Sequence, residues 1–318
     1  MKVLANDGIS QAGIDALEAA GYAVLTDKVE QEDLIDTINK DNIEVLLVRS
    51  ATTVRKDMID GCPNLKLIGR GGVGMDNIDV QYGRDSGKLV VNTPAASSQS
   101  VAELVMGHMF AISRSLNDSY KNMEGGNFKT LKKKYGKGVE LRGKKLLIVG
   151  FGRIGQNLAA YALGCGMDVI AVDTYTDARE ISLQLGNGLS AATSIAPTSS
   201  LMDVIGHADY ISLHIPKQSD GSAVIGATEF ASMKDGVRII NAARGGVIDE
   251  DALMTALDSG KVASIALDVF ENEPNPRADL LSHEKIACTP HVGAATVEAQ
   301  ARIGTELAEI IISHFGQK

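Results

Sequence analysis

The stretch KKLLIVGFGRIGQNLAAYALG, residues 144–164, decides the fold of this chain. An apolar run ends in Gly150, Gly152 and Gly155, and small and apolar residues then follow at helical spacing. Such a run predicts a strand covered on both faces of a sheet, and the glycines predict a tight turn into a helix. The pattern G-x-G-x-x-G in this context indicates a βαβ unit whose helix N-terminus can face a pyrophosphate.

The next predicted strand ends in Asp173, about 20 residues after the last glycine, where dinucleotide-binding folds carry an acid. A carboxylate there hydrogen-bonds the ribose hydroxyls of NAD and repels the 2′-phosphate of NADP. A glycine-rich βαβ unit without a ligand would show the same turn, but strand, helix and acid together favour a cofactor. The sequence therefore predicts NAD binding.

Strand and helix patterns alternate on both sides of this unit. The first hundred residues predict strands at 2–6, 22–26, 45–49, 66–69 and 89–91, and the later residues predict strands at 146–150, 168–173, 210–215, 238–243, 264–269 and 286–289. Alternating strands and helices form parallel sheets that helices cover on both faces. We expect an α/β chain with two doubly wound parallel-sheet domains.

A segment rich in proline and serine, NTPAASSQS at 92–100, marks the first domain boundary. Ser100 and Glu103 indicate a capping box that opens a long apolar helix ending near Leu116. The residues from 121 to 143 are polar and rich in lysine, which is typical of a loop or a short connector.

The last segment, 296–315, predicts an amphipathic helix, since Ile303, Leu307 and Ile310 recur at helical spacing. A terminal helix of this kind often packs on the first domain of the chain. We therefore expect a Rossmann NAD-binding domain at 98–293 inserted into a flavodoxin-like substrate-binding domain made of 1–97 and 294–318.

Composition and charge exclude several classes of function. The 318 residues carry a net charge of −9, which offers no basic surface to nucleic acid or to an anionic membrane. The start MKVLANDGIS is not a signal peptide, and no apolar run reaches the ~18 residues of a membrane span. Cys62, Cys165 and Cys288 are odd in number and far apart, which favours reduced thiols over a disulfide framework or a metal site. We expect a cytoplasmic protein without a bound metal.

Three polar residues follow successive predicted strands of the second domain. Arg244 follows the strand in RIINAARGGVIDE (238–250), beside two glycines that let something approach the backbone closely. Glu273 lies in DVFENEP and His291 in CTPHVGAAT, each shortly after a strand. Ligands of open α/β sheets bind at the carboxyl ends of strands, so the three side chains are expected to converge beside the nicotinamide. Each one alone has a plain alternative as a surface charge, a solvated acid or a residue at the start of a helix.

Together the three residue types suit hydride transfer. Oxidation of a secondary alcohol needs a base for the hydroxyl proton, and histidine titrates in the right range. A neighbouring carboxylate orients the histidine ring, and a guanidinium binds a substrate carboxylate through two parallel hydrogen bonds. This set favours an NAD-dependent dehydrogenase over a protein without chemistry at this edge of the sheet.

In the segments NAARGGVIDE, ALDVFENEP and TPHVGAAT, and along essentially its full length, the chain resembles the D-isomer-specific 2-hydroxyacid dehydrogenases. The resemblance implies that Arg244 holds the substrate carboxylate and carbonyl, that Glu273 supports the histidine, and that His291 is the acid/base. It also implies a homodimer built on the apolar helix after Ser100 and on the connector. The fingerprint and the resemblance together imply cofactor contacts from Val73, Gly150, Gly152, Arg153, Ile154, Gly155, Asp173, His214, Ile215, Pro216, Ala242, Ala243, Arg244, Asp268, His291, Gly293 and Ala294.

The first domain is most similar to the phosphoglycerate dehydrogenase branch of this family, through LLVRSATTV (46–54) and IGRGGVGMDNID (68–79). The similarity implies oxidation of 3-phosphoglycerate to 3-phosphohydroxypyruvate in serine biosynthesis, without the C-terminal regulatory domain of longer relatives. Asp76 and Asn77 are expected to order the loop, and Val73 stands where many relatives carry a hydroxyl. The residues implied to bind the substrate are Arg49, Ser50, Arg70, Gly71, Gly72, Val73 and Arg244.

Other activities share the same three residues. Glyoxylate/hydroxypyruvate reductase and D-lactate dehydrogenase remain alternatives, whereas formate dehydrogenases are expected to carry Gln in place of Glu273. A protein of another class, a corepressor-like NAD-sensing binding protein, uses the same scaffold and keeps the three residues. The sequence shows no appended interaction segment of the kind such a protein would use.

Overall fold

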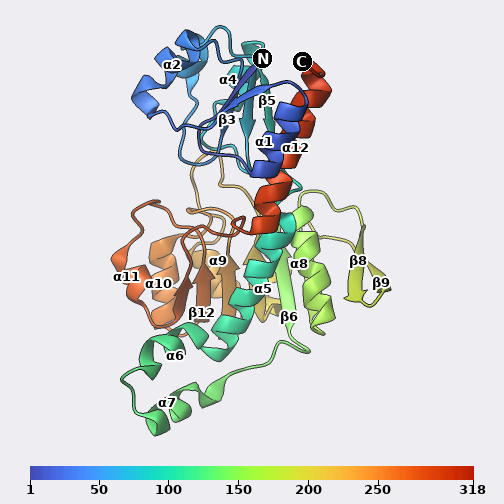
Figure 1. Cartoon of the computed structure of the whole chain (residues 1–318). Coiled ribbons are helices and arrows are strands. Elements are labelled where there is room, and N and C mark those ends of the chain that lie inside the picture. Colours follow the sequence, from blue (N-terminus) through green and yellow to red (C-terminus); the bar gives the residue numbers. More distant parts are fainter. The chain divides into compact units, whose positions relative to one another are not determined.

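The structure, a computed structural model, describes residues 1–318. The chain divides into two compact units: Met1–Ser98 with Ala294–Lys318, called unit 1, and Gln99–Gly293, called unit 2. Each unit is built on a sheet of parallel strands with helices around it (Figure 1). The predicted α/β class with two parallel sheets is confirmed.

Unit 1 contains a five-stranded parallel sheet in the order β2-β1-β3-β4-β5, the order of flavodoxin-like folds. The interior strands β3 and β4 are almost entirely buried because helices cover both faces of the sheet. The strands are β1 (Lys2–Ala5), β2 (Ala23–Leu25), β3 (Val45–Val48), β4 (Leu67–Arg70) and β5 (Leu89–Asn92).

The helices of unit 1 are α1 (Gln11–Ala19), α2 (Leu34–Lys40), α3 (Lys56–Gly61), α4 (Val80–Asp85) and α12 (Val297–Phe315). Ser10 caps α1, since its side chain accepts a hydrogen bond from the amide of Gly13. The terminal helix α12 packs against α1 at two glycines, where a Cβ on Gly13 would lie 2.8 Å from the backbone of Gly304. The end of the chain is held there too, because the Tyr22 hydroxyl donates to the carbonyl of Gly316 at 2.6 Å.

Unit 2 contains a six-stranded parallel sheet in the order β13-β12-β11-β10-β6-β7. The first strand of this sheet along the chain is β6. The next strand, β7, lies on one side of it, and β10 to β13 follow on the other side. This order places the topological switch point of a Rossmann fold between β6 and β10. The strands are β6 (Lys145–Val149), β7 (Asp168–Val172), β10 (Tyr210–Leu213), β11 (Val237–Asn241), β12 (Val262–Leu267) and β13 (Ile286–Cys288). The helices that cover this sheet are α5 (Ser98–Arg114), α8 (Arg153–Gly164), α9 (Ala227–Ser232), α10 (Glu250–Asp258) and α11 (Ala278–Ser282).

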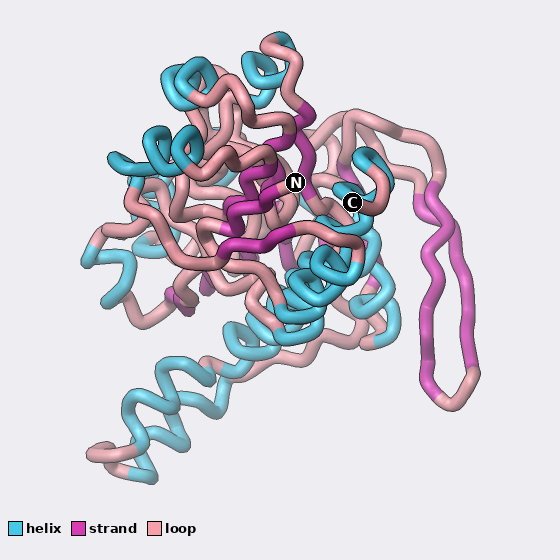
Figure 2. Tube along the Cα trace, turned by 45° about the horizontal axis from the view of Figure 1, so that its top comes forward, coloured by secondary structure: helices cyan, strands magenta, loops and turns pink.

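A hairpin that the sequence analysis missed projects from unit 2 (Figure 2). It pairs β8 (Arg179–Gly186) with β9 (Leu189–Ile195) in antiparallel register. Apolar residues alternate along β8, where Ile181 is buried, and Asn187 and Gly188 make the turn with positive φ. Alternation around an Asn-Gly turn is a hairpin signal, so this element was present in the sequence.

Two local predictions around α5 are wrong. The helix begins at Ser98 and ends at Arg114, so Ser100 lies inside its first turn and does not cap it. The connector is also more regular than expected, because it forms α6 (Leu116–Met123), α7 (Phe128–Lys134) and a short 3-10 helix, η2 (Tyr135–Lys137). Lysines at the carboxyl end of α7 stabilise it through the helix dipole. Across the whole chain, none of the helices combines the length and apolar character that a membrane span requires.

Candidate active site

The glycine turn after β6 has the shape that a dinucleotide needs. Gly150 has φ +93°, and a Cβ there would lie 2.5 Å from the carbonyl oxygen of His214. A Cβ on Gly155 would overlap the carbonyl oxygen of Gly150, so this glycine lets α8 start close to the strand. Gly152 precedes α8 without any side-chain cap, which leaves the first amides of the helix available to an anion.

Asp173 lies directly after β7 and faces this turn. Its Oδ2 accepts a hydrogen bond from the amide of Phe151 at 2.6 Å, and its Oδ1 accepts one from the amide of Tyr175 at 3.0 Å. An ionised carboxylate has about four acceptor positions, so Asp173 keeps capacity for ribose hydroxyls while it is held in place. The cradle and the acid fit NAD.

His214 connects the strand β10 to the glycine turn. Its amide donates to the carbonyl of Val149 at 2.7 Å, and its Nε2 lies 2.8 Å from the hydroxyl of Ser212. Its Nδ1 is buried without a hydrogen-bond partner, and burial lowers the pKa of the ring to about 4. The imidazole is therefore neutral at physiological pH.

Glu273 and His291 form a hydrogen-bonded pair. The distance from His291 Nδ1 to Glu273 Oε2 is 2.8 Å, and Glu273 Oε1 accepts the amide of Phe270 at 3.0 Å. The pair is half-exposed, with 45% of the His291 side chain accessible, so Nε2 can meet a substrate. His291 itself has a left-handed backbone with φ +51°, which is uncommon for a residue other than glycine.

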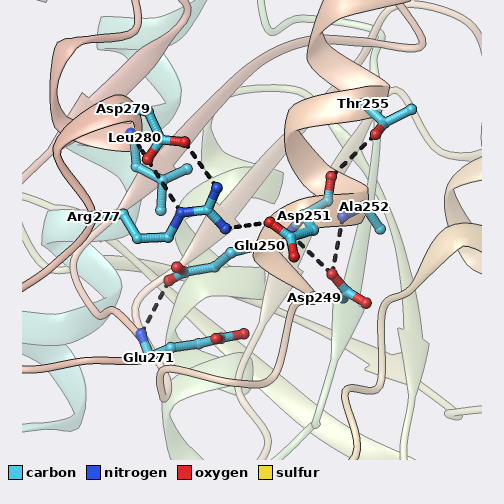
Figure 3. Close-up of polar contacts among 9 residues, drawn as sticks. All are labelled: Asp249, Glu250, Asp251, Ala252, Thr255, Glu271, Arg277, Asp279 and Leu280. Carbon is cyan, nitrogen blue, oxygen red and sulfur yellow. Dashed lines mark hydrogen bonds and ion pairs between the residues drawn. The ribbon is translucent and has the colours of Figure 1, made fainter.

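The loop between β12 and α11, which carries the carboxylate of this pair, is attached to α10 (Figure 3). The amide of Glu271 donates to the carboxylate of Glu250 at 3.0 Å, and burial raises the pKa of this carboxyl. Arg277 binds both Asp251 and Asp279, the latter at 2.8 Å. The exposed ion pairs add little stability, but together with the buried Glu250 contact they hold the loop near both of its ends.

Arg244 extends from the end of β11. The side-chain amide of Asn241 donates to the Arg244 carbonyl at 3.0 Å, and the Arg244 guanidinium donates to the carbonyl of Ala243 at 2.6 Å. At Gly245, the glycine next to Arg244, the main chain of another loop comes close. A Cβ on Gly245 would overlap the carbonyl oxygen of Phe270, in the loop that carries Glu273. Because β11, β12 and β13 are adjacent and parallel, Arg244, Glu273 and His291 all lie at one edge of the unit 2 sheet.

Unit 1 carries a second group of predicted residues at the carboxyl ends of β3 and β4. Arg70 is the last residue of β4 and pairs in register with Val48, the last residue of β3, after which Arg49 follows. The Arg49 side chain passes beside Gly71, with Cγ 3.6 Å from the position of a Cβ there. A Cβ on Gly72 would overlap the Arg70 guanidinium. Two arginines therefore share one edge of this sheet.

The loops around these arginines are held by Asp7 and Thr93, which sequence reasoning did not single out, and by Asn77. Asp7 accepts the amide of Arg49 at 2.6 Å, and the hydroxyl of Thr93 accepts the amide of Gly72 at 2.8 Å. Asn77 donates to the Arg49 carbonyl at 2.6 Å, consistent with the expected ordering of this loop. Ser50 is exposed and Val73 is 38% exposed, so both side chains are accessible.

The predicted cofactor residues are distributed over both units. Val73 and Ala294 belong to unit 1, and the remaining ones belong to unit 2. The buried Asp268 turns out to bind the backbone beside His291 and the hydroxyl of Thr289, which in turn contacts His108 in α5. Sequence reasoning missed His108 and Thr289, although a lone histidine in an apolar helix was a visible signal.

Comparisons with known proteins agree with this geometry. Residues 106–293 match the family described as "D-isomer specific 2-hydroxyacid dehydrogenase, NAD binding domain". The chain is 41% identical to a hydroxypyruvate reductase of Thermotoga maritima, with 95% of this chain and 97% of that protein covered. It is 40% identical to a D-3-phosphoglycerate dehydrogenase of Methanocaldococcus jannaschii. That match covers 98% of this chain but only 57% of that protein. The structure of a D-lactate dehydrogenase from Aquifex aeolicus, complexed with NAD and lactic acid, matches with a TM-score of 0.75 and 26% identity over 99% of this chain and 95% of that chain.

Proposed function

The chain belongs to the D-isomer-specific 2-hydroxyacid dehydrogenases, and from that premise we propose that it oxidises 3-phosphoglycerate to 3-phosphohydroxypyruvate with NAD, as a step of serine synthesis in the cytoplasm. The observation that carries the choice of substrate is the pair of arginines, Arg49 and Arg70, at one edge of the unit 1 sheet. A substrate with both a carboxylate and a phosphate can bind more positively charged side chains than Arg244 alone.

The residues of unit 2 divide the work of the reaction. NAD, held by the glycine turn after β6 and by Asp173, would supply the hydride acceptor for C2 of the substrate. His291 takes the hydroxyl proton on Nε2, because its Nδ1 is engaged by Glu273 at 2.8 Å. Glu273 holds the ring in orientation and stabilises the imidazolium that forms. Arg244 binds the substrate carboxylate and polarises the C2 oxygen. In the reverse direction His291 returns the proton to the carbonyl oxygen.

The charge of the substrate explains the role that we assign to unit 1. Phosphoglycerate carries about three negative charges near neutral pH, since the second pKa of a phosphate ester lies near 6. The protein has a net charge of −9, so binding needs a local positive site. Arg49 and Arg70 supply it for the phosphate.

The test compares kcat/KM for phosphohydroxypyruvate, hydroxypyruvate, glyoxylate and pyruvate with NADH. Phosphohydroxypyruvate is expected to be the best substrate. Arg49→Ala and Arg70→Ala should lower its kcat/KM by about 10- to 100-fold, the value of a charge-assisted hydrogen bond, with little effect on hydroxypyruvate. Arg84→Ala, in α4 of the same unit, is the matched control and should change neither substrate. A loss that is equal for phosphorylated and unphosphorylated substrates would refute the phosphate assignment.

A specific observation favours a second candidate, hydroxypyruvate reductase. The Thermotoga maritima relative of that name is matched over 97% of its length, whereas the phosphoglycerate dehydrogenase is matched over 57%. If the chain is a hydroxypyruvate reductase, hydroxypyruvate is the best substrate of the unmutated enzyme. Arg49→Ala and Arg70→Ala then do not lower kcat/KM for phosphohydroxypyruvate more than kcat/KM for hydroxypyruvate.

We also propose a homodimer formed through the surface of α5, α6 and α7. Large apolar side chains are exposed there, namely Phe110 (47%), Tyr120 (74%), Met123 (51%) and Phe128 (67%). Such a cluster on one segment is typical of a protein interface. Phe128→Glu and Tyr120→Glu should produce monomers in sedimentation experiments, whereas Tyr175→Glu, at an equally exposed aromatic residue elsewhere, should not. A wild-type protein that sediments as a monomer at every concentration would contradict the proposal.

A further inference from the structure

We infer that His108 and Thr289 are positioning residues for His291, acting through the buried carboxylate of Asp268. This inference rests on the proposed role of His291 as the acid/base. All four residues belong to unit 2, and the contacts that connect them come from α5, from the end of β12 and from the segment after β13.

The carboxylate of Asp268 is the centre of this arrangement. It is 1% exposed and follows β12 directly. Its Oδ1 accepts hydrogen bonds from the hydroxyl of Thr289 at 2.6 Å and from the amide of Val292 at 2.9 Å, and its Oδ2 accepts the amide of Gly293 at 2.9 Å. A buried charge is stable only with such partners, so the carboxylate and the segment after β13 fix one another.

These contacts determine the backbone at His291. Its φ of +51° is a left-handed conformation that is strained for a residue other than glycine, so the surroundings must impose it. The amide of His291 donates to the Asp268 carbonyl at 2.8 Å, and the amides of the next two residues bind the Asp268 carboxylate. Asp268 therefore holds three successive amides, and this sets the direction in which the imidazole leaves the backbone.

The direction of the hydrogen bonds shows how His108 takes part. The Thr289 hydroxyl must donate to the Asp268 carboxylate, because an ionised carboxylate only accepts. Its oxygen then accepts from His108 Nε2, which lies 3.0 Å away and must carry the proton. His108 is 5% exposed, and its burial lowers the ring pKa, so it is a neutral donor. The chain of donors thus runs from α5 to Asp268.

Packing alone does not account for a histidine at this position. The buried positions around it on α5 are apolar, among them Val105, Met109 and Ile112. An imidazole there carries a desolvation cost that a leucine would avoid, and the one hydrogen bond that offsets this cost is the bond to Thr289. The residue is therefore best explained by what it does to Thr289.

The experiment uses two pairs of variants in the full-length protein. Thr289→Val removes the hydroxyl at constant shape, and Thr289→Ser keeps it. His108→Leu removes the donor, and His108→Gln keeps a donor close to the position of Nε2. Met106→Leu, a volume-conserving change in α5, is the control. The measurements are kcat and KM with NADH, the melting temperature, and hydrogen–deuterium exchange over a peptide that covers 286–300.

We expect Thr289→Val and His108→Leu to lower kcat about 10-fold or more, since small displacements of a reacting group have effects of this size. Thr289→Ser and His108→Gln should restore most of the rate, and KM should change less than kcat. Exchange at the amides of 291–293 should be faster in the two disruptive variants and unchanged in Met106→Leu.

Equal kcat within each pair, with only the melting temperature lowered, would overturn the inference. Should Thr289→Val fail to fold, the comparison of His108→Leu with His108→Gln decides by the same criterion. A wild-type protein that reduces none of the four keto acids would instead refute the proposed function. In that case faster exchange at 291–293 in the disruptive variants would still support the positioning contacts.

Discussion

Gly245 lies where the backbone after β11 contacts the loop after β12, so its replacement by alanine tests what positions Glu273. A Cβ at residue 245 would overlap the carbonyl oxygen of Phe270 and lie 2.7 Å from the amide nitrogen of Glu271. Ordinary van der Waals contact for a Cβ begins near 3.4 Å. Both neighbouring atoms belong to the main chain, and the closer one, the Phe270 oxygen, requires that one backbone segment move by roughly 1 Å or more in this close-packed region.

This displacement reaches the proposed acid/base pair through short connections. The amide of Phe270 binds Glu273 Oε1 at 3.0 Å, and Glu273 Oε2 binds His291 at 2.8 Å. Forcing an extra methyl group into a packed site costs typically ~1–3 kcal/mol of stability. A misplacement near ~1 Å can lower turnover up to ~10²-fold. We therefore expect Gly245→Ala to be less stable by about 1–3 kcal/mol and to lose about 10- to 100-fold in kcat.

The assay combines steady-state reduction of the preferred keto acid with denaturant unfolding. Gly164→Ala is the matched control, because Gly164 is the last residue of α8 and no atom lies within 4 Å of its Cβ position. This variant should keep its turnover and should be as stable as the wild type or slightly more stable. A Gly245→Ala enzyme with lower stability but wild-type kcat would show that the loop absorbs the methyl group without moving Glu273, and the reasoning would fail.

Three further predictions concern the cofactor and the acid/base pair. Asp173→Ala should narrow the preference for NAD over NADP, measured as the ratio of kcat/KM values, because it removes the repulsive carboxylate; an unchanged ratio would exclude the assigned role. His214 has a pKa of about 4 in the folded protein, whereas its ordinary value is 6.5. Between pH 4 and pH 6.5, therefore, the His214 ring is protonated in the unfolded chain but not in the folded chain. Stability should therefore fall as the pH drops from 6.5 towards 4, by up to about 3 kcal/mol, and urea unfolding of His214→Asn should lack this part of the decline. His291→Ala should lose ~10²–10⁴-fold in kcat with NAD affinity nearly intact in a titration, and Glu273→Gln should lose less; a large loss of NAD affinity in either variant would point to a binding role instead.

Local patterns of the sequence determined much of this protein. The turn at Gly150 and the amphipathic helix α12 depend on neighbours within a few residues, so periodicity and residue type were sufficient to predict them. The parallel order of strands followed from their alternation with helices. The placement of Arg244, Glu273 and His291 after successive strands also came from the sequence alone, because the carboxyl ends of parallel strands share one edge. Their catalytic roles stay predictions.

The tertiary structure decided the features that depend on distant contacts. The true start of α5 and the two helices of the connector differ from expectation where local signals were weak or polar. Gly245 is required because the main chain at Phe270 lies against it, and not because of its own φ. Only the folded position of the loop at Phe270 shows this requirement. The chain of hydrogen bonds from His108 to Asp268 joins segments more than a hundred residues apart. No pattern within a short window encodes such contacts, because only the packing of α5 against the ends of the strands brings these groups together.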